Sequence, residues 1–326
     1  MENHLKRFNE IKSKWEIFKS NPENKKTRIK NAADTLEVSE ADLLSTEIGE
    51  NVFYLDIANY DQFFQKFIDI DKIMLLIRSD YVVHEIIVNS SKIIFKKDSL
   101  ACSENPNRPF TIFDPKLFKF VFFEKKIHAG KELKSFQFFD INGKALIKIF
   151  LKGLKTNRFE EIASEYKKEY QYDIQKAALN QNKKNINLIR GVNILEREYN
   201  IKNYNLETNE INKNILRYVL DGASNNSIPI RIHAFGDKIN QNYRGLVKKI
   251  VDFGPWINVM DKYFNLHVLE NNIKKSIIND YHKTKNNLII ISFFDSNNNK
   301  VIDIGPMEGH DKKFKKLIYS MEGINE

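Results

Sequence analysis

An internal repeat constrains the fold of this chain more than any other feature of its 326-residue sequence. Residues 138–149 read FFDINGKALIKI and residues 293–304 read FFDSNNNKVIDI, so an aromatic pair, an aspartate and an apolar alternation recur 155 positions later. A weaker match relates residues 118–124 (FKFVFFE) to residues 264–270 (FNLHVLE). One such match is compatible with two unrelated hairpins, but two matches in the same order favour a tandem duplication.

Hydrophobic periodicity predicts helices at the start of the chain and strands after them. Apolar residues at three- and four-residue spacings predict helices over 5–18 and 28–36. Ser39 followed by Asp42 is typical of the N-cap of a further short helix. From residue 51 the period shortens toward two, which predicts a series of strands rich in Ile, Val, Phe and Tyr, among them 73–78, 81–88 and 228–235. Each half therefore reads as a helical entry followed by antiparallel strands that end in the same hairpin.

Composition excludes several classes of protein. Hydrophobic residues make up 42% of the chain, which is too many for a disordered protein. A single cysteine rules out an internal disulfide and a cysteine-rich metal site. No apolar run approaches the roughly 18 residues of a membrane span, and the N-terminus lacks a secretory signal pattern. We therefore expect a cytoplasmic protein without membrane insertion.

The helical pair over residues 28–44 leaves a DNA-binding interpretation open. Its spacing and the net charge of +9 are compatible with a helix-turn-helix regulator. Against this, its second helix would begin with Glu40 and Asp42, which place carboxylates where a recognition helix meets phosphates. A structural helical hairpin is the better interpretation, and we do not expect a nucleic-acid partner.

Four sequence blocks occur in the order found in a known family. They are RIKNAADTLEVSEADLL (28–44), RSDYVVHE (78–85), SFQFFDINGKALIKIF (135–150) and GPWINVMDKYFNLHVLENNI (254–273). Together they resemble the HemS/ChuS-type hemin-degrading, or haem-utilisation, family. The blocks extend over most of the chain, and their order agrees with the internal repeat.

The resemblance implies a fold class and an organisation into two repeats. The expected class is α+β: a tandem duplication in which each half is a twisted, mostly antiparallel sheet with packed helices. The first structural repeat is expected to cover residues 1–160, and the second residues 161–326. In this organisation the long central segment supplies helical connection and cover.

The resemblance also implies a function in haem utilisation. The chain would bind imported hemin for iron acquisition, with haem as ligand or substrate, and would either degrade it oxidatively or carry and store it. Oxygenase-type degradation would require an external electron donor, whereas a carrier would require a haem-acceptor protein. The sequence does not separate these two activities, and loss of haem binding in a retained fold is a further alternative.

His84 is the leading candidate for the haem iron ligand. On a strand it shares a face with Val82, Ile86 and Val88, so its imidazole would project from an apolar surface. From spacing alone, a buried histidine that hydrogen-bonds a neighbouring carbonyl is the favoured interpretation. The resemblance strengthens the interpretation of His84 as a haem-site histidine, because His84 stands at the position of the histidine in the family's Val-His-Glu block.

Two arginines complete the predicted haem-binding set. Arg78, just before a turn, could bind a haem propionate, but an isolated arginine at a strand end can also be merely solvated. Arg197 lies in a region that resembles a family helix with a pocket-facing arginine. Its alternative role is an intrahelical ion pair with Glu196 or Glu198.

The chain departs from the family at the expected axial histidine. In the family this residue opens the helical segment of the second half, yet residues 159–200 here contain no histidine. Lys184 stands near that place, but a protonated lysine does not bind iron. The strand over 110–113 also lacks the family's distal arginine. Binding through His84, or through Tyr170 or Tyr172, therefore remains open.

Overall fold

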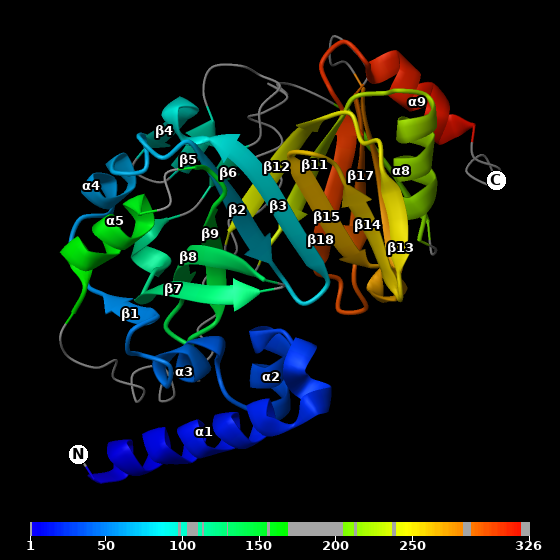
Figure 1. Cartoon of the computed structure of the whole chain (residues 1–326). Coiled ribbons are helices and arrows are strands. Elements are labelled where there is room, and N and C mark those ends of the chain that lie inside the picture. Colours follow the sequence, from blue (N-terminus) through cyan, green and yellow to red (C-terminus); the bar gives the residue numbers. More distant parts are fainter. Residues whose placement is uncertain are drawn as a thin grey trace. The chain divides into compact units, whose positions relative to one another are not determined.

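The computed structural model describes most of the chain, in two compact units. The described residues are 2–96, 99–102, 110–112, 114–128, 130–154, 157–168, 205–211, 214–236, 239–282 and 288–320 (Figure 1). One unit comprises Met1–Leu75, Asn89–Ser91 and Asp114–Asn185, and the other comprises Leu76–Val88, Lys92–Phe113 and Ile186–Glu326. The units are defined by their spatial compactness and not by the internal repeat. The boundary between the two predicted repeats, at residues 160 and 161, therefore stays a prediction.

Helices open the first unit, as the apolar spacings predict. They are α1 (Glu2–Ser20), the 3₁₀ turn η1 (Pro22–Lys26), α2 (Ile29–Leu36) and α3 (Glu40–Ser45). Ser39 caps α3: its hydroxyl accepts from the Asp42 amide at 3.0 Å, and the Asp42 carboxylate accepts from the Ser39 amide at 3.1 Å. This capping box confirms the predicted start of the helix.

The helical pair is structural. All six residues of α3 are buried, including the carboxylate-bearing Glu40 and Asp42. A recognition helix must be exposed to enter a DNA groove. The structure therefore disfavours the helix-turn-helix alternative and agrees with the predicted structural hairpin.

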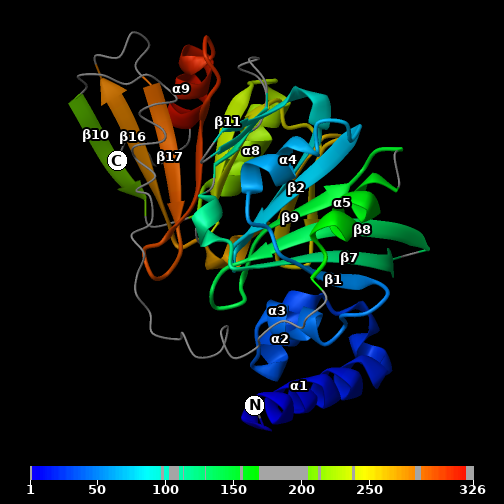
Figure 2. The same ribbon diagram turned by 90° about the vertical axis from the view of Figure 1, so that its left-hand side faces the viewer.

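The strands of the first unit carry helices on both faces. They are β1 (Val52–Leu55), β7 (Phe120–His128), β8 (Lys131–Phe139), β9 (Ala145–Leu151) and β2 (Lys72–Arg78), the last of which continues into the second unit. One face packs against α4 (Tyr60–Gln65) and α5 (Arg158–Tyr166) through a cluster of phenylalanines, among them Phe63, Phe136 and Phe159. The other face packs against α1, α2 and α3 through Phe120, Phe122 and Phe139 (Figure 2).

The second unit contains a complete nine-stranded antiparallel sheet, which we call sheet B. Two helices, α8 (Leu216–Asn225) and α9 (Asp311–Tyr319), belong to the same unit. The strand order of sheet B is β10 (Asn205–Ile211), β16 (Lys275–His282), β17 (Leu288–Phe294), β18 (Lys300–Pro306), β11 (Ile230–Phe235), β12 (Asn240–Gly245), β6 (Phe110–Ile112), β5 (Ser99–Cys102) and β4 (Ile93–Lys96).

A second nine-stranded sheet, sheet A, has the same topology as sheet B. Its order is β1-β7-β8-β9-β2, followed by β3 (Val82–Asn89), β15 (Phe264–Leu269), β14 (Trp256–Met260) and β13 (Ile250–Phe253). Position by position, β1 corresponds to β10, β7 to β16, β8 to β17, β9 to β18, β2 to β11 and β3 to β12. The last three places hold an exchanged meander: β4–β6 extends sheet B, and β13–β15 extends sheet A. The chain is thus an α+β tandem duplication, as predicted.

The repeated hairpin has the same construction in both copies. The Asp140 side chain accepts from the amides of Asn142 and Lys144, at 2.9 and 3.0 Å. The Asp295 side chain accepts from the amides of Asn297 and Asn299, at 2.8 Å each. One residue in each turn is left-handed: Gly143 with φ 72° and, 155 positions later, Asn298 with φ 59°. The first predicted repeat match is therefore confirmed.

The second predicted match is wrong. Residues 118–124 lie at the start of β7, whose counterpart in the other sheet is β16, 155 positions later. Residues 264–270 instead form β15, whose counterpart is β6. The two stretches resemble each other because both are strands with large apolar residues at alternate positions.

Candidate functional site

His84 lies in the core of the second unit. It is 0% exposed, on β3, and shares its face with the buried Val82 and Ile86. Leu266 lies opposite it on β15, and the ring of Phe264 contacts the imidazole edge-on at 5.0 Å between centroids. The apolar face that the alternation predicts is therefore present.

A buried chain of hydrogen bonds fixes the His84 ring. Nδ1 lies 2.6 Å from Oε1 of Gln241 on β12, and Nε2 of Gln241 donates to Oγ1 of Thr111 on β6 at 2.8 Å. Because an amide oxygen only accepts, Nδ1 carries the proton and Nε2 holds the free lone pair. Nε2 has no hydrogen-bond partner within the described part of the chain. Burial lowers the pKa of His84 to about 4, although the hydrogen bond that His84 donates to Gln241 opposes this shift, so the ring is neutral at pH 7.

Of the two predicted arginines, one is described. Arg78 ends β2 and is half-buried. Arg197 lies outside the described residues, as do Lys184, Tyr170 and Tyr172. The structure therefore places His84 and Arg78 on neighbouring strands, β3 and β2, and gives no geometry for Arg197.

Sheet B has one apolar face and one polar face in its centre. Ile232 and Ile304 face the side on which α9 packs, where Lys315 and Tyr319 of α9 bond the Asp280 carboxylate at 2.9 Å each. The alternate residues point the other way. We call this second side the His233 face, and it comprises Arg231, His233, Asn242, Arg244, Ser292 and Asp303. Arg231, His233, Asn242, Ser292 and Asp303 on this face are all buried.

The register of sheet B brings these polar side chains together. His233 on β11 pairs with Asn242 on β12 and with Asp303 on β18, and Asp303 pairs with Ser292 on β17. Two residues away on the same two strands, Arg231 pairs with Arg244. Side chains directly opposite each other on one face have Cβ atoms about 5 Å apart, so the six form one cluster.

His233 is buried beside the side chain of Asn242. It is 1% exposed, and neither ring nitrogen has a partner of good geometry within the described residues. Burial lowers its pKa to about 3; the nearby amide of Asn242 opposes this, whereas Lys300, His84 and Arg244 add to it. The imidazole is therefore neutral at pH 7.

The rest of the face is rich in charge. The Lys300 ammonium donates to Asp303 at 3.2 Å and lies 5.5 Å from the Phe235 ring centre. Burial raises the pKa of Asp303, and Lys300 opposes that rise. Arg231 and Arg244 pair across β11 and β12, so both side chains lie on this face.

Sequence reasoning predicted a strand at 228–235 but assigned no role to its polar residues. The signal was present, because Arg231 and His233 alternate with Ile230, Ile232 and Ala234. In a strand flanked by apolar residues, such alternation marks a polar face. What the sequence could not give is which face the helices cover.

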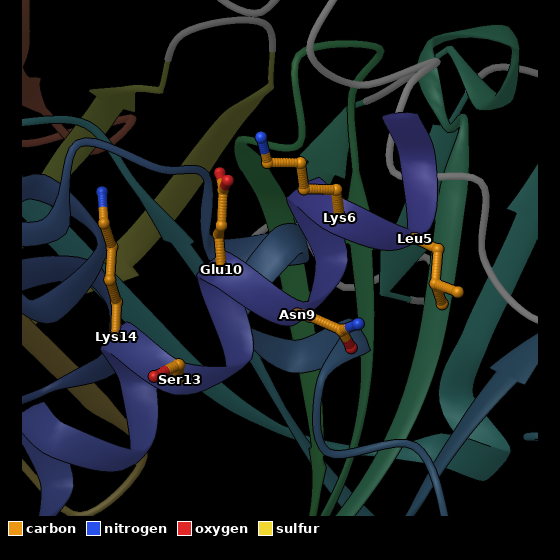
Figure 3. A pocket seen from close by; sticks show the side chains of 6 residues that line it. All are labelled: Leu5, Lys6, Asn9, Glu10, Ser13 and Lys14. Atoms are coloured by element: carbon orange, nitrogen blue, oxygen red, sulfur yellow. The ribbon is translucent and has the colours of Figure 1, made fainter. Parts of the chain in front are cut away.

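Two surface hollows lie elsewhere. One is lined within the described residues by six residues of α1 (Figure 3). The other lies between the ends of α8 and α9, against Asn226, Lys313 and Lys316. Neither is lined by His84 or His233. Within the described ranges no cluster of three His, Cys, Asp or Glu side chains could hold a bare metal ion, and no helix is long and apolar enough to span a bilayer.

The fold and the polar face define a class: a duplicated α+β protein with two nine-stranded sheets that exchange a meander and with one buried polar face. Residues 53–168 match the family model described as haem utilisation ChuX/HutX. The resemblance to haem-utilisation proteins is therefore confirmed for that part of the sequence.

Solved structures extend the likeness in fold to nearly the whole chain. ChuS from Escherichia coli O157:H7, described as a heme-degrading enzyme, shares 17% identity over 96% of this chain and 98% of its own, with a TM-score of 0.78. Holo-PhuS from Pseudomonas aeruginosa, described as a heme-binding protein, shares 17% identity over 97% and 99%, also at 0.78. No curated protein matches the sequence.

Proposed function

We propose that this protein binds haem and handles imported hemin for iron acquisition. The proposal is supported by the family match of residues 53–168 and by the fold shared with ChuS and PhuS. The observation that carries it is the buried, neutral His84, whose Nε2 has no hydrogen-bond partner within the described residues.

The residues present fit the chemical needs of haem. Haem requires a neutral donor for iron, cationic groups for two propionates and an apolar surface for the macrocycle. Two buried histidines are neutral at pH 7, and Arg231, Arg244 and Arg78 supply guanidinium groups in the same unit. When bound and reduced, haem iron supplies the ability to bind dioxygen. The protein's own residues would bind and orient the ring and exclude water.

His84, Arg78 and Arg197 remain the haem contacts proposed from the sequence. His84 has the unpaired Nε2 that an axial ligand requires. Its surroundings are apolar, which suits the ring of a porphyrin but not its carboxylates. Variants of these residues therefore belong in the hemin titration that tests the proposed function.

Degradation and carriage differ in what happens after binding. A degrading enzyme needs an external electron donor, and a carrier needs an acceptor protein for haem. We propose either partner as the next component in the cytoplasm, where sequence reasoning places the protein. Adding reductant and oxygen to the haem complex separates the two activities, because degradation removes the Soret band and carriage preserves it.

A hemin titration followed by absorbance tests the proposal. We expect a saturable Soret change with the unaltered chain and the same change with His267→Ala. His267 is half-buried on β15 and bonds Asn258 at 2.5 Å, so it serves as a matched histidine control. Absence of saturable binding by the unaltered chain would refute haem binding and leave a protein that has kept only the fold.

A further inference from the structure

The hairpin of β13 and β14, at the end of sheet A, carries a cluster of exposed apolar side chains (Figure 1). Twelve large apolar side chains are exposed among the described residues, and four of them lie within residues 251–263. They are Phe253 at 81%, Tyr263 at 49%, Met260 at 40% and Val251 at 38%. Single exposed apolar residues are ordinary on a protein surface, whereas a group of them marks a contact site.

The register of the hairpin places three of the four on one face. Phe253 on β13 lies opposite the half-buried Trp256 on β14. Val251 lies two residues before Phe253, and Lys249 two residues before Val251. The Met260 amide donates to the Lys249 carbonyl at 2.8 Å, which continues the same register. Because alternate residues of a strand point to the same side, these five side chains form one surface, which we call the Phe253 face.

The other side of the hairpin is fixed to the second unit. Ile257 and Val259 of β14 are 1% and 0% exposed, and the Asp252 carboxylate accepts from Arg217 of α8. The turn between the strands is open, because no described atom outside the neighbouring residues lies within 4 Å of where a Cβ of Gly254 would stand. An anchored hairpin therefore presents the Phe253 face outward.

Three exposed lysines border the Phe253 face. Lys248 and Lys249 immediately precede β13, and Lys262 lies in the turn after β14. None of the three forms an ion pair within the described part of the chain. The carboxylate between them, Asp261, accepts from the amides of Lys248 and Lys249 at 3.1 Å each and so fixes the backbone. The Lys262 ammonium lies 5.1 Å from the centre of the Tyr263 ring. The border therefore offers positive charge to the occupant of the face.

Charge and composition favour one kind of occupant. A second copy of the chain would bring like-charged lysines together, and lysine is depleted at protein interfaces in general. Aromatic side chains beside lysines are instead typical of surfaces that lie at a bilayer interface, where the rings sit at the level of the head groups. Each lysine near an anionic leaflet is also attracted to it.

We propose that the Phe253 face docks reversibly on an anionic membrane surface, with its apolar side chains in the head-group region and the three lysines against lipid phosphates. Such docking needs no spanning helix. The inference goes beyond haem binding and does not depend on it. It would hold a protein that handles imported hemin at the surface that hemin crosses.

Co-sedimentation of the full chain with lipid vesicles, in the absence of hemin, tests the proposal. We expect binding to vesicles of equal parts phosphatidylglycerol and phosphatidylcholine, and binding at least about tenfold weaker to phosphatidylcholine alone. Added salt should weaken the binding, because it screens the attraction between lysine and phosphate. Phe253→Ser should lower the affinity for the anionic vesicles about tenfold, since it removes the largest apolar group of the face.

The lysines are tested as a group. About tenfold weaker binding and loss of most of the salt dependence are expected for the triple variant Lys248→Gln/Lys249→Gln/Lys262→Gln. A matched control removes the same charge from exposed positions of α9, with the triple variant Lys312→Gln/Lys313→Gln/Lys316→Gln. The control should keep its affinity within about twofold.

The outcomes separate docking from its alternatives. Leu154→Ser, at a side chain that is 89% exposed in the other unit, should bind vesicles as the unaltered chain does. Absence of binding to anionic vesicles overturns the proposal, and so does binding that neither Phe253→Ser nor the first lysine variant weakens. A dimer seen by analytical ultracentrifugation and lost in Phe253→Ser would overturn it in favour of a second copy. Circular dichroism checks that each variant is folded, and hemin titration stays an independent test of haem binding.

Discussion

The same sheet surface is used in two different ways in the two copies of the repeat. Lys148 on β9 and Asp303 on β18 are equivalent positions, 155 residues apart, as are Gln137 and Ser292. In the first copy the surface packs under α1, α2 and α3, and its polar groups have partners supplied by the chain. Lys148 donates to Glu40 of α3 at 2.7 Å, and Gln137 donates to Glu124 at 2.7 Å.

In the second copy the equivalent Asp303 accepts from Lys300 of its own strand at 3.2 Å, and Ser292 accepts from Asn279 of the neighbouring strand at 3.2 Å. The difference teaches that the same surface can take its partners from a distant helix or from the strands themselves. The N-terminal helices supply a buried carboxylate in one copy, whereas the strands supply the partners in the other. Four predictions test this contrast.

The ion pair that closes the first copy should give the largest effect. Glu40→Ala removes the carboxylate that neutralises the buried Lys148 ammonium, so the free energy of unfolding should fall by about 3–5 kcal/mol. Urea denaturation measures this loss, and the double variant Glu40→Leu/Lys148→Met should recover much of it. The exposed pair Lys30–Asp34 is the matched control, where Asp34→Ala should cost less than about 1 kcal/mol. A loss that small for Glu40→Ala would contradict the closed-surface interpretation.

Acid should destabilise the second unit through its two buried histidines. Their pKa values in the folded protein, about 4 for His84 and about 3 for His233, lie below the ordinary 6.5 of an unfolded chain. Unfolded protein therefore takes up these protons first. Their stabilising contribution is complete above pH 6.5 and is lost as the pH falls toward 4 and 3. Each should reduce the free energy of unfolding by about 2 kcal/mol at pH 5.

Urea midpoints at pH 7 and pH 5 measure this dependence. His84→Gln and His233→Gln should each flatten it, and His128→Gln, at an exposed position of β7, should not. Equal pH dependence in all three variants would show that burial of these imidazoles is not what makes the fold acid-sensitive.

Gln241 should matter for the stability of the second unit. Gln241→Ala leaves the Nδ1 proton of His84 buried without its acceptor, so we expect a loss of about 1–3 kcal/mol. The half-buried Asn265, which donates to Glu85, is a control whose alanine variant should cost less. Thermal denaturation measures both, and a changed haem spectrum in Gln241→Ala would argue for His84 as the ligand.

Ser39 should give the smallest effect. Ser39→Ala removes half of the capping box of α3, at a cost of about 1 kcal/mol, and should leave hemin affinity unchanged because α3 belongs to the closed copy. Ser164→Ala, which removes an exposed hydroxyl bonded within α5, provides the baseline in the same denaturation experiment. A weakened hemin affinity in Ser39→Ala would link the two copies functionally.

Local chemistry made much of the fold predictable. The capping box at Ser39 and the turns at Asp140 and Asp295 depend on residues within four positions of each other, and sequence reasoning found all three. The exchange of β4–β6 and β13–β15 was missed, since pairing partners far apart in sequence leave no periodic signal. The false match of 118–124 with 264–270 has the same origin.

The candidate site was predictable only in part. The period of two correctly placed His84 on an apolar face, but it could not show that Gln241, distant in sequence, bonds its ring. The burial of His233 was not predicted, because it depends on neighbours that lie far away in the sequence. Which sheet face receives helices is a tertiary property, and a single strand does not encode it.

The exchanged meander has a consequence for synthesis on the ribosome. Strand β6 finds its neighbour only when β12 has emerged, and β3 must wait for β15. The first copy therefore cannot complete its hydrogen-bonded edge during its own translation. Nascent chains should therefore present open strand edges for a prolonged interval, which favours slow maturation and recruitment of chaperones.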